Sequence, residues 1–262
     1  MNRDRLTRAQ KEDVKQFRSI TSASEKTAVD YLKLEGWVLQ NSIDAYYTNP
    51  PARSTPKTDK RAIEKLWAKY KDPNEDVMRA EGVAQFVEDL KVDPTDVAVL
   101  VLCYHCKADI MSEFSREEFV GGLSHLGCDS LDKLRRRLPE LRAELDDDCT
   151  FRKVYEFAYG FARKRGTKIV EQPMAIAMWG LLLMGNRSWV LLDEWSKFLA
   201  EKHNRPILRD TWLMLLDFAW TTKTDFSNYD PLEEAWPPLI DEFVDYICAQ
   251  RGQPSPTEVK VT

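Results

Sequence analysis

Apolar residues recur along this chain at the spacing of an α-helix, and this periodicity limits its possible folds more than any other feature. The segments 10–20, 59–70 and 93–104 each place their apolar residues three or four positions apart. No stretch of useful length alternates apolar and polar residues as a half-buried strand does, and glycine is scarce, at 10 of 262 residues. The sequence therefore predicts an all-α protein, and it contains no solenoid-type repeat.

A proline-rich segment divides the chain into two expected domains. Three prolines and small polar residues occupy positions 49–58, which we interpret as an extended linker. Residues 6–48 predict three short helices around a shared core that includes Trp37, a compact module of the ubiquitin-associated type. Residues 59–250 predict a larger helical domain, and the polar segment 251–262 predicts a flexible tail.

Capping residues and prolines predict where the helices of the larger domain begin. A side-chain oxygen at the N-cap satisfies free backbone N–H groups, and proline is tolerated in the first helical turn. Glu118 completes a capping box that begins three residues earlier. The expected helix starts are Asp59, Asp93–Pro94, Ser115, Pro139, Thr150, Pro173, Ser188 and Asp210.

Composition excludes several classes of partner. The net charge is -5, which argues against a nucleic-acid binder, and the longest apolar run, 175–184, is about half of a membrane span. We therefore expect no nucleic-acid partner and no membrane partner. The 5 cysteines form no disulfide-like pattern, so we expect reduced thiols in an intracellular protein of the cytoplasm and nucleus.

A zinc site is the sharpest chemical alternative. The sequence contains two pairs of possible zinc ligands, Cys103 with Cys106 and His125 with Cys128. Together they could complete a tetrahedral site. The first pair lies in an apolar helical run, where free cysteine behaves as a small hydrophobe. The sequence also lacks a P-loop, a dinucleotide fingerprint, a nucleophile elbow and an EF-hand calcium loop. We therefore predict no catalytic residue, no metal and no cofactor.

The stretch 210–250 combines negative charge with aromatic side chains. It holds nine acidic residues and one basic residue, Lys223. Such a surface suits a basic protein partner, and the alternative is a solvated acidic end of the domain. Trp212, Trp236 and Phe243 are expected to support this surface from inside.

Several blocks, in order along nearly the whole chain, resemble the defective-in-cullin-neddylation family. The blocks are 25–29, 126–130, 174–177, 210–218, 226–230 and 234–244. The resemblance implies an all-α protein with an N-terminal ubiquitin-associated-like module. The larger domain would be a potentiating-neddylation (PONY) domain, multi-helical, with an EF-hand-like substructure that lacks calcium.

The resemblance also implies a function. Family members are scaffolds that bind the C-terminal winged-helix region of a cullin and the N-terminally acetylated tail of the neddylation-conjugating enzyme. They accelerate transfer by proximity and orientation, without a covalent intermediate. The alternative that remains open is a non-catalytic EF-hand-like adaptor for another basic protein. Ubiquitin is a further implied partner of the N-terminal module, although the turn 18–22 lacks the usual Met-Gly-Phe/Tyr motif.

The resemblance assigns two sets of site residues. The cullin patch matches Asp210, Ala235 and Asp241, whose carboxylates can pair with Lys or Arg around a small residue. The family's apolar pocket for the acetylated methionine matches Val83, Val99, Leu102, Cys103, Cys106, Phe114, Phe161, Met178 and Leu181. The family more often has bulkier residues where Cys106 and Met178 stand.

Overall fold

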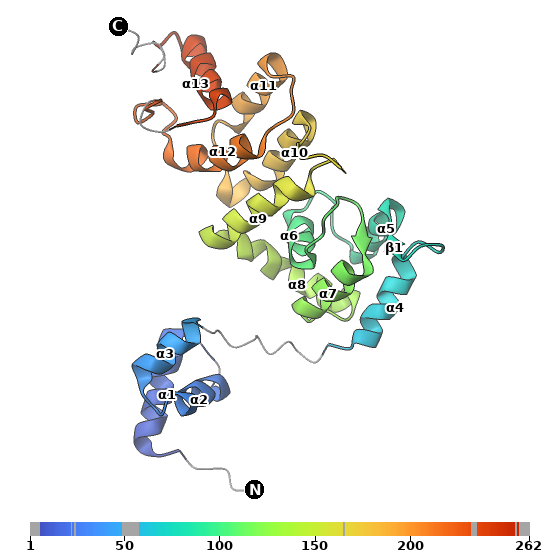
Figure 1. Ribbon diagram of the computed structural model, residues 1–262, viewed down its shortest axis with the longest axis vertical. Coiled ribbons are helices and arrows are strands. Elements are labelled where there is room, and N and C mark those ends of the chain that lie inside the picture. The colour runs from blue at the N-terminus through green and yellow to red at the C-terminus, as the bar shows by residue number, and fades with distance from the viewer. Residues whose placement is uncertain are drawn as a thin grey trace. The chain divides into compact units, whose positions relative to one another are not determined.

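The computed structural model in Figure 1 describes residues 6–21, 23, 25–48, 58–164, 166–231, 235–254 and 256. The chain divides into two compact units, Met1–Lys57 and Thr58–Thr262. Helices form almost all of the regular structure within the described ranges, which confirms the predicted all-α class. None of the helices in these ranges has the length and apolarity that a membrane span requires.

The elements follow one another with short connections. In chain order they are α1 (Arg8–Thr21), α2 (Glu25–Leu34), α3 (Leu39–Thr48), α4 (Lys60–Tyr70), β1 (Val77–Met78), α5 (Ala80–Leu90), α6 (Val97–Cys106), β2 (Phe114–Ser115), α7 (Arg116–Leu126), α8 (Leu131–Ala143), η1 (Glu144–Asp146), α9 (Asp148–Phe161), α10 (Gln172–Leu182), η2 (Gly185–Arg187), α11 (Leu192–Lys202), α12 (Arg209–Thr221) and α13 (Pro238–Arg251). Residues 49–57 of the predicted linker lie outside the described residues, as do 255 and 257–262 of the predicted tail.

The first unit is a three-helix module with its own small core. Phe17 of α1 and Leu32 of α2 are fully buried, and Ile43 of α3 packs with them. Trp37 packs against this core, as predicted. The α2–α3 turn is closed by the Trp37 N–H, which donates to the Leu32 carbonyl at 2.6 Å, and both Gly36 and Trp37 adopt positive φ angles.

The second unit begins with a pair of helix–loop–helix motifs, α4–β1–α5 and α6–β2–α7. Their loops pair through the antiparallel strands β1 and β2, which gives the EF-hand-like substructure that the resemblance implies. The predicted capping box is present, because Ser115 and Glu118 bond each other's backbone N–H groups. The Glu118 carboxylate also accepts the Asp109 N–H at 2.8 Å, so backbone donors of the loop occupy this carboxylate.

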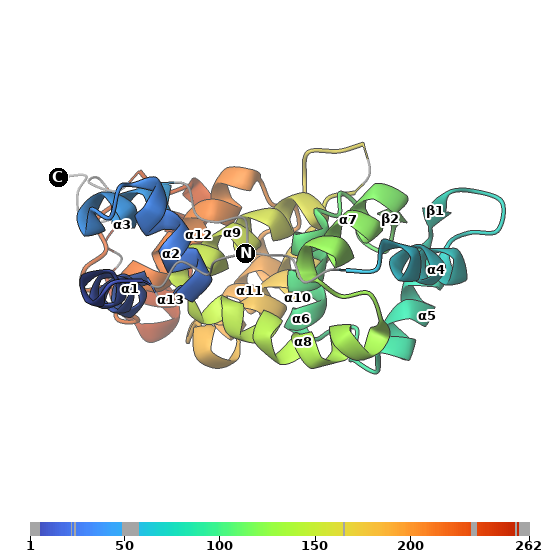
Figure 2. The same cartoon turned by 90° about the horizontal axis from the view of Figure 1, so that it is seen from below.

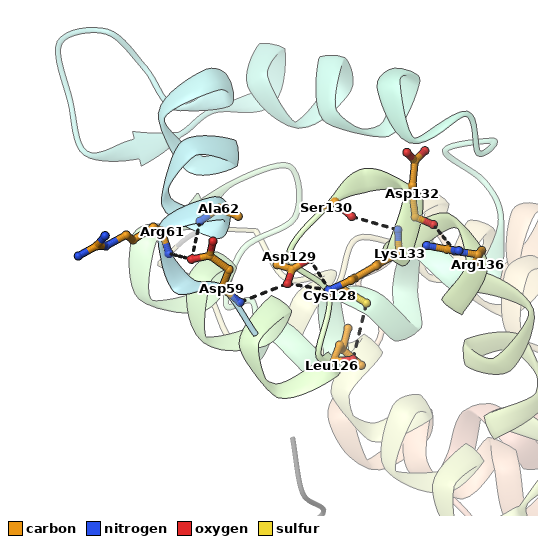
Figure 3. Close-up of polar contacts among 10 residues, drawn as sticks. All are labelled: Asp59, Arg61, Ala62, Leu126, Cys128, Asp129, Ser130, Asp132, Lys133 and Arg136. Atoms are coloured by element: carbon orange, nitrogen blue, oxygen red, sulfur yellow. Dashed lines mark hydrogen bonds and ion pairs between the residues drawn. The ribbon is translucent and has the colours of Figure 1, made fainter. Parts of the chain in front are cut away.

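Figure 3 shows how the start of α4 is attached to the α7–α8 connection. Asp59 caps α4, as predicted, by accepting N–H groups of its first turn. The Asp59 N–H donates to the Asp129 carboxylate at 3.2 Å, and Asp129 also pairs with Lys133 at 2.7 Å. Ser130 caps α8 by accepting the Lys133 N–H. These short polar contacts fix the first helix of the unit to the fifth.

The remaining helices surround a stack of aromatic rings. The Tyr155 ring of α9 and the Trp179 ring of α10 both stack on Trp212 of α12, each at 4.9 Å between ring centroids. The Trp179 Nε1 donates to the Tyr155 hydroxyl at 2.8 Å, so this buried polar group is satisfied. In both views, α4 and α5 lie at one end of the second unit and α13 at the other, with α6 to α10 between them (Figures 1 and 2).

The N-caps of three helices lie three residues from the predicted positions. Asp93 accepts the Thr95 N–H in a turn, and Asp96 is the cap of α6. Thr150 lies in the first turn of α9 and donates to the real cap, Asp147, at 2.8 Å. In both cases an aspartate three residues from the predicted cap is the actual cap, and the local pattern does not decide between the two candidates. The helix that was predicted to start at Ser188 is α11, and it starts at Leu192.

Pro139 does not begin a helix, contrary to the prediction. It lies inside α8, where it removes one backbone hydrogen bond at a typical cost of about 3 kcal/mol. Leu134, Leu138 and Leu141 are buried on either side of it. Their burial on one helix face outweighs the lost bond and keeps α8 continuous. Pro173, by contrast, lies in the first turn of α10, as predicted.

Candidate functional site

An apolar cavity of about 290 Å³ lies between α5, α6, α9, α10 and the loop before β2. It is at the lower end of the usual size range for ligand pockets. None of its lining residues is charged. They are Ala80, Val83, Ala84, Val87, Pro94, Val99, Leu100, Cys103, Ile110, Met111, Ser112, Phe114, Phe161, Met178 and Leu181.

Seven of the nine predicted pocket residues line this cavity. They are Val83, Val99, Cys103, Phe114, Phe161, Met178 and Leu181. Leu102 and Cys106 do not line it. Cys106 packs against α7 so closely that a Cβ on Gly122 would lie 2.3 Å from its sulfur. Leu102 is four residues earlier, on the same face of α6, whereas Val99 and Cys103 share the face toward the cavity.

Eight lining residues were not predicted. Val87 could have been found, because it lies one helical turn after Val83 and shares its face. Ile110, Met111 and Ser112 come from the loop before β2, where no periodicity indicates direction. Ser112 has φ 62°, which is the left-handed backbone conformation. A serine side chain does not indicate this conformation, so the course of the turn could not be predicted from the sequence.

A second hollow, of about 660 Å³, adjoins the cavity. The two share four lining residues: Pro94, Met111, Met178 and Leu181. Met174 and Met184 complete a group of four methionines around the second hollow, which we call the methionine hollow. Methionine side chains are flexible and apolar, so this surface can adapt to the shape of an apolar ligand.

The thiol in the cavity is not prepared for nucleophilic chemistry. Burial, aided by the charge of Glu118, raises the pKa of Cys103 to about 12. Burial also raises the pKa of the Cys106 thiol well above its ordinary value. The thiolate is the reactive form, so both groups are inert near neutral pH. Cys103 therefore contributes apolar surface to the cavity.

The four side chains considered as zinc ligands do not gather at one place and have other neighbours. No three His, Cys, Asp or Glu side chains within the described residues gather as a metal site would require. Cys103 faces the cavity, and Cys106 faces α7. His125 lies beside His105, which bonds Glu144 at 2.6 Å. The Cys128 thiol approaches the Leu126 carbonyl at 3.6 Å (Figure 3).

Asp210 is an exposed residue in the first turn of α12. It is not the N-cap, contrary to the prediction, because Leu208 occupies that position in an extended conformation. The helix therefore does not use the Asp210 side chain to satisfy its first N–H groups. A carboxylate in a first helical turn still interacts favourably with the positive end of the helix dipole. Its substitution should affect stability less than the loss of a cap would.

Ala235 and Asp241 flank the start of α13. Ala235 is exposed, and Asp241 is half-buried in the first turn of the helix. The Tyr229 hydroxyl donates to the Asp241 carboxylate, and the Tyr229 ring stacks on Trp236 at 6.4 Å. Burial raises the pKa of Asp241, and the hydrogen bond from Tyr229 opposes this shift. The Tyr229–Trp236 pair thus fixes Asp241 and the segment that carries Ala235.

Aromatic residues support the acidic surface from inside. Phe218 of α12 packs edge-on against both Tyr229 and Trp236. Trp212 and Phe243 are fully buried and Trp236 is partly buried, as predicted. Asp210 lies about two helical turns before Phe218 on α12. The helix that carries Asp210, α12, packs on α13, which carries Asp241.

The comparisons with known proteins cover both units. A family described as cullin binding matches residues 133–246, and a UBA-like domain family matches residues 11–53. Defective in cullin neddylation protein 1 of Caenorhabditis elegans is 32% identical over 97% of this chain and 95% of that protein. DCN1-like protein 3 of Bos taurus is 36% identical over 77% of this chain and 67% of that protein. DCN1-like protein 3 of Homo sapiens is 37% identical over 72% of this chain and 63% of that protein. The chain therefore belongs to the defective-in-cullin-neddylation family.

Proposed function

We propose that this protein is a non-catalytic scaffold for cullin neddylation. Its acidic surface binds the winged-helix region of a cullin, and its apolar cavity binds the N-terminally acetylated methionine of the neddylation-conjugating enzyme. The cavity, with seven of the matched residues around an uncharged space, is the observation that carries this proposal. The family match and the names of the relatives support the cullin half of it.

The lining of the cavity explains why acetylation should matter. Burying one methionine side chain is worth roughly 1.5–3 kcal/mol. A free amino terminus would carry a positive charge into a lining without any charged residue, where its desolvation is costly. Acetylation removes this charge and adds a small apolar group. The acetylated form should therefore bind much more tightly than the free amine.

The acidic surface suits a basic partner for a different reason. The raised pKa of Asp241 indicates that burial penalises its charged form in the absence of a partner. A Lys or Arg side chain of a cullin would compensate this penalty with a charge-assisted hydrogen bond. The small exposed side chain of Ala235 allows a partner to approach closely.

Both surfaces belong to the compact unit Thr58–Thr262. A cullin and a charged conjugating enzyme bound to one unit are held near each other, which raises their effective concentration. This mode of action requires no nucleophile on the scaffold, in keeping with the raised pKa values of its buried thiols.

Ubiquitin is a second candidate partner, for the N-terminal unit. The match to a UBA-like domain favours it. Ile20 and Tyr47 are exposed apolar residues, and the Tyr47 hydroxyl donates to the Ile20 carbonyl at 3.1 Å. They form a small apolar surface at the α1–α2 turn. Titration of the isotope-labelled full chain with ubiquitin should shift the NMR signals of these two residues.

A reconstituted neddylation assay tests the main proposal. The full chain should accelerate transfer of the modifier to a cullin, and a peptide with an acetylated N-terminal methionine should inhibit the acceleration. The same peptide with a free amine is the matched control. If the chain bound neither the cullin nor the acetylated peptide, the alternative of an adaptor for another basic protein would replace this proposal.

A further inference from the structure

Methionines are concentrated at one place on the molecule. The chain has 7, and four of them line the methionine hollow beside the cavity. Two of these, Met111 and Met178, line the cavity as well. Core packing alone does not require this clustering, because the hollow is open and one of the four, Met184, is 65% exposed. The cluster places several oxidisable thioethers at the edge of a binding site.

The four methionines differ in their access to solvent. Met184 is the most exposed, and both Met174 and Met111, which lies in the turn before Ser112, are half-buried. Met178 is only 7% exposed, and Met78, elsewhere in the core, is completely buried. Oxidation of methionine follows exposure when the thioethers are chemically alike. A dilute oxidant should therefore reach Met184, Met111 and Met174 long before the buried Met178 and Met78.

We propose that oxidation of Met111 is a redox switch that weakens binding of the acetylated methionine in the cavity. This inference rests on the proposed function and adds a form of regulation to it. The oxidant is a hydroperoxide such as hydrogen peroxide. Its O–O bond breaks, one oxygen forms the S–O bond of the sulfoxide, and the other leaves as water. The sulfur loses a pair of electrons, and the peroxide gains them.

The lining of the cavity explains why one oxygen atom should have a large effect. A sulfoxide oxygen is a strong hydrogen-bond acceptor, and among the described lining residues only Ser112 carries a hydroxyl group. When a ligand fills the cavity, it excludes the water that would otherwise solvate this oxygen. An unpaired polar atom at such an interface costs enough to weaken binding by about tenfold.

The shared position of Met111 makes it the decisive residue. Met184 and Met174 line the methionine hollow but not the cavity, so their oxidation should change affinity little. Met178 lines both, but its burial protects it. Met111 is the residue that combines contact with the cavity and access to solvent. Methionine sulfoxide is enzymatically reducible, so the effect should be reversible.

The experiment uses the full chain and a synthetic peptide that begins with N-acetyl methionine. The chain is treated with increasing hydrogen peroxide, catalase removes the excess, and the peptide is then added. Peptide mass spectrometry measures the sulfoxide at each methionine, and fluorescence anisotropy measures the affinity. We expect sulfoxide at Met184, Met111 and Met174 first, and about a tenfold loss of affinity that follows Met111. Treatment with methionine sulfoxide reductases should restore binding.

Two variants separate the switch from general damage. Met111→Leu conserves volume but has no sulfur to oxidise, so, whatever its starting affinity, the ratio of its peptide affinities before and after peroxide should stay close to one. Met214→Leu removes a methionine of α12 that lines neither hollow, so it should remain sensitive like the unmodified chain. The thermal unfolding midpoint of the oxidised chain should stay close to that of the reduced chain.

Three outcomes would overturn the proposal. One is unchanged affinity when Met111 is fully oxidised. A second is an equal loss of affinity in the Met111→Leu variant. A third is a fall in unfolding midpoint that accounts for the lost binding. A chain that fails to bind the peptide before any peroxide is added would instead refute the proposed function of the cavity, and the switch with it.

Discussion

The apolar cavity and the acidic surface occupy different parts of one unit and are built in opposite ways. The cavity collects side chains from four helices and a loop around a space, so its residues are also core residues. The acidic surface exposes a few side chains over an aromatic core that is complete without them. A substitution in the cavity should therefore change stability and binding together, whereas a substitution on the surface can separate them.

The largest expected effect is on the acidic surface. Asp241→Arg places a positive charge where a basic partner should bind, and it should weaken cullin binding by about 3 kcal/mol or more, over 100-fold. Because Asp241 is only half-buried, we expect unfolding free energy to change by about 1 kcal/mol at most. Isothermal titration with a cullin C-terminal fragment and urea denaturation measure the two quantities.

Asp193→Arg is the matched control for this substitution. Asp193 is likewise an acid in a first helical turn, on α11, and it is exposed whereas Asp241 is half-buried. Its reversal should reduce the association rate slightly through the overall field and leave the affinity almost unchanged. Equal losses in both variants would mean that net charge, and not the Asp241 contact, accounts for binding.

The second largest effect concerns the wall of the cavity. Gly122→Ala would place a Cβ 2.3 Å from the Cys106 sulfur, at the crossing of α6 and α7. Relief of this overlap must move α6, which carries Val99 and Cys103 of the cavity lining. We expect a loss of about 2–3 kcal/mol of unfolding free energy, measured by urea denaturation, and weaker binding of the acetylated peptide.

The neighbouring Gly121 provides the control. A Cβ there meets no atom within 4 Å. Since alanine has a higher helix propensity than glycine, Gly121→Ala should stabilise the unit by up to about 1 kcal/mol. Destabilisation of similar size in both variants would contradict the steric explanation.

A smaller effect is expected inside the cavity. Leu181→Ala removes apolar contact with the ligand, and it should weaken binding of the acetylated peptide by about 1.5 kcal/mol, roughly tenfold. Leu213→Ala, on α12, removes a similarly half-buried leucine that does not line the cavity. Both variants should lose stability, but only the first should lose affinity in an anisotropy titration.

The sequence predicted features that depend on helical spacing and failed where geometry between elements decides. The family resemblance, and not helical spacing, pointed to Val99 and Cys103 of α6, and both line the cavity. Their neighbours Leu102 and Cys106 carry the same apolar signal but do not line the cavity, and Cys106 packs against Gly122 of α7. An all-round apolar helix gives no indication of which face meets a pocket.

The acidic residues illustrate a second limit. The residue type of Asp210 suits both an N-cap and a surface contact, and only the helix start at Arg209 excludes the first role. Ala235 and Asp241 were interpretable only through the family resemblance, because an exposed alanine carries no signal. The role of Tyr229 as the hydrogen-bond donor to Asp241 could not be predicted, since it depends on the path of the loop before α13.

The smallest predicted effect is on the pH dependence of stability. Asp89 and Asp241, one acid from each end of the unit, should contribute to this dependence with opposite signs. Hydrogen bonds from Lys69 and then Tyr70 lower the pKa of Asp89, on α5, to about 2. Its contribution to stability is therefore present above the ordinary value of 3.8 and is lost as the pH falls toward about 2. Burial raises the pKa of Asp241, so folding disfavours its charged form, and stability falls as the pH rises from the ordinary value of 3.8 through the raised pKa.

Asparagine substitutions isolate these two contributions. At neutral pH, Asp89→Asn should destabilise the unit, because it removes a charge that α4 stabilises. Asp241→Asn should stabilise it slightly, by less than about 1 kcal/mol, since asparagine can still accept the Tyr229 hydrogen bond. Urea denaturation between pH 3 and pH 7 measures both differences. If Asp241→Asn stabilises the unit and also weakens cullin binding, the Asp241 carboxylate charge lowers the free energy of unfolding but is required for binding. A destabilising Asp241→Asn would place Asp241 with the structural acids, and would remove the contrast between the two ends of the unit.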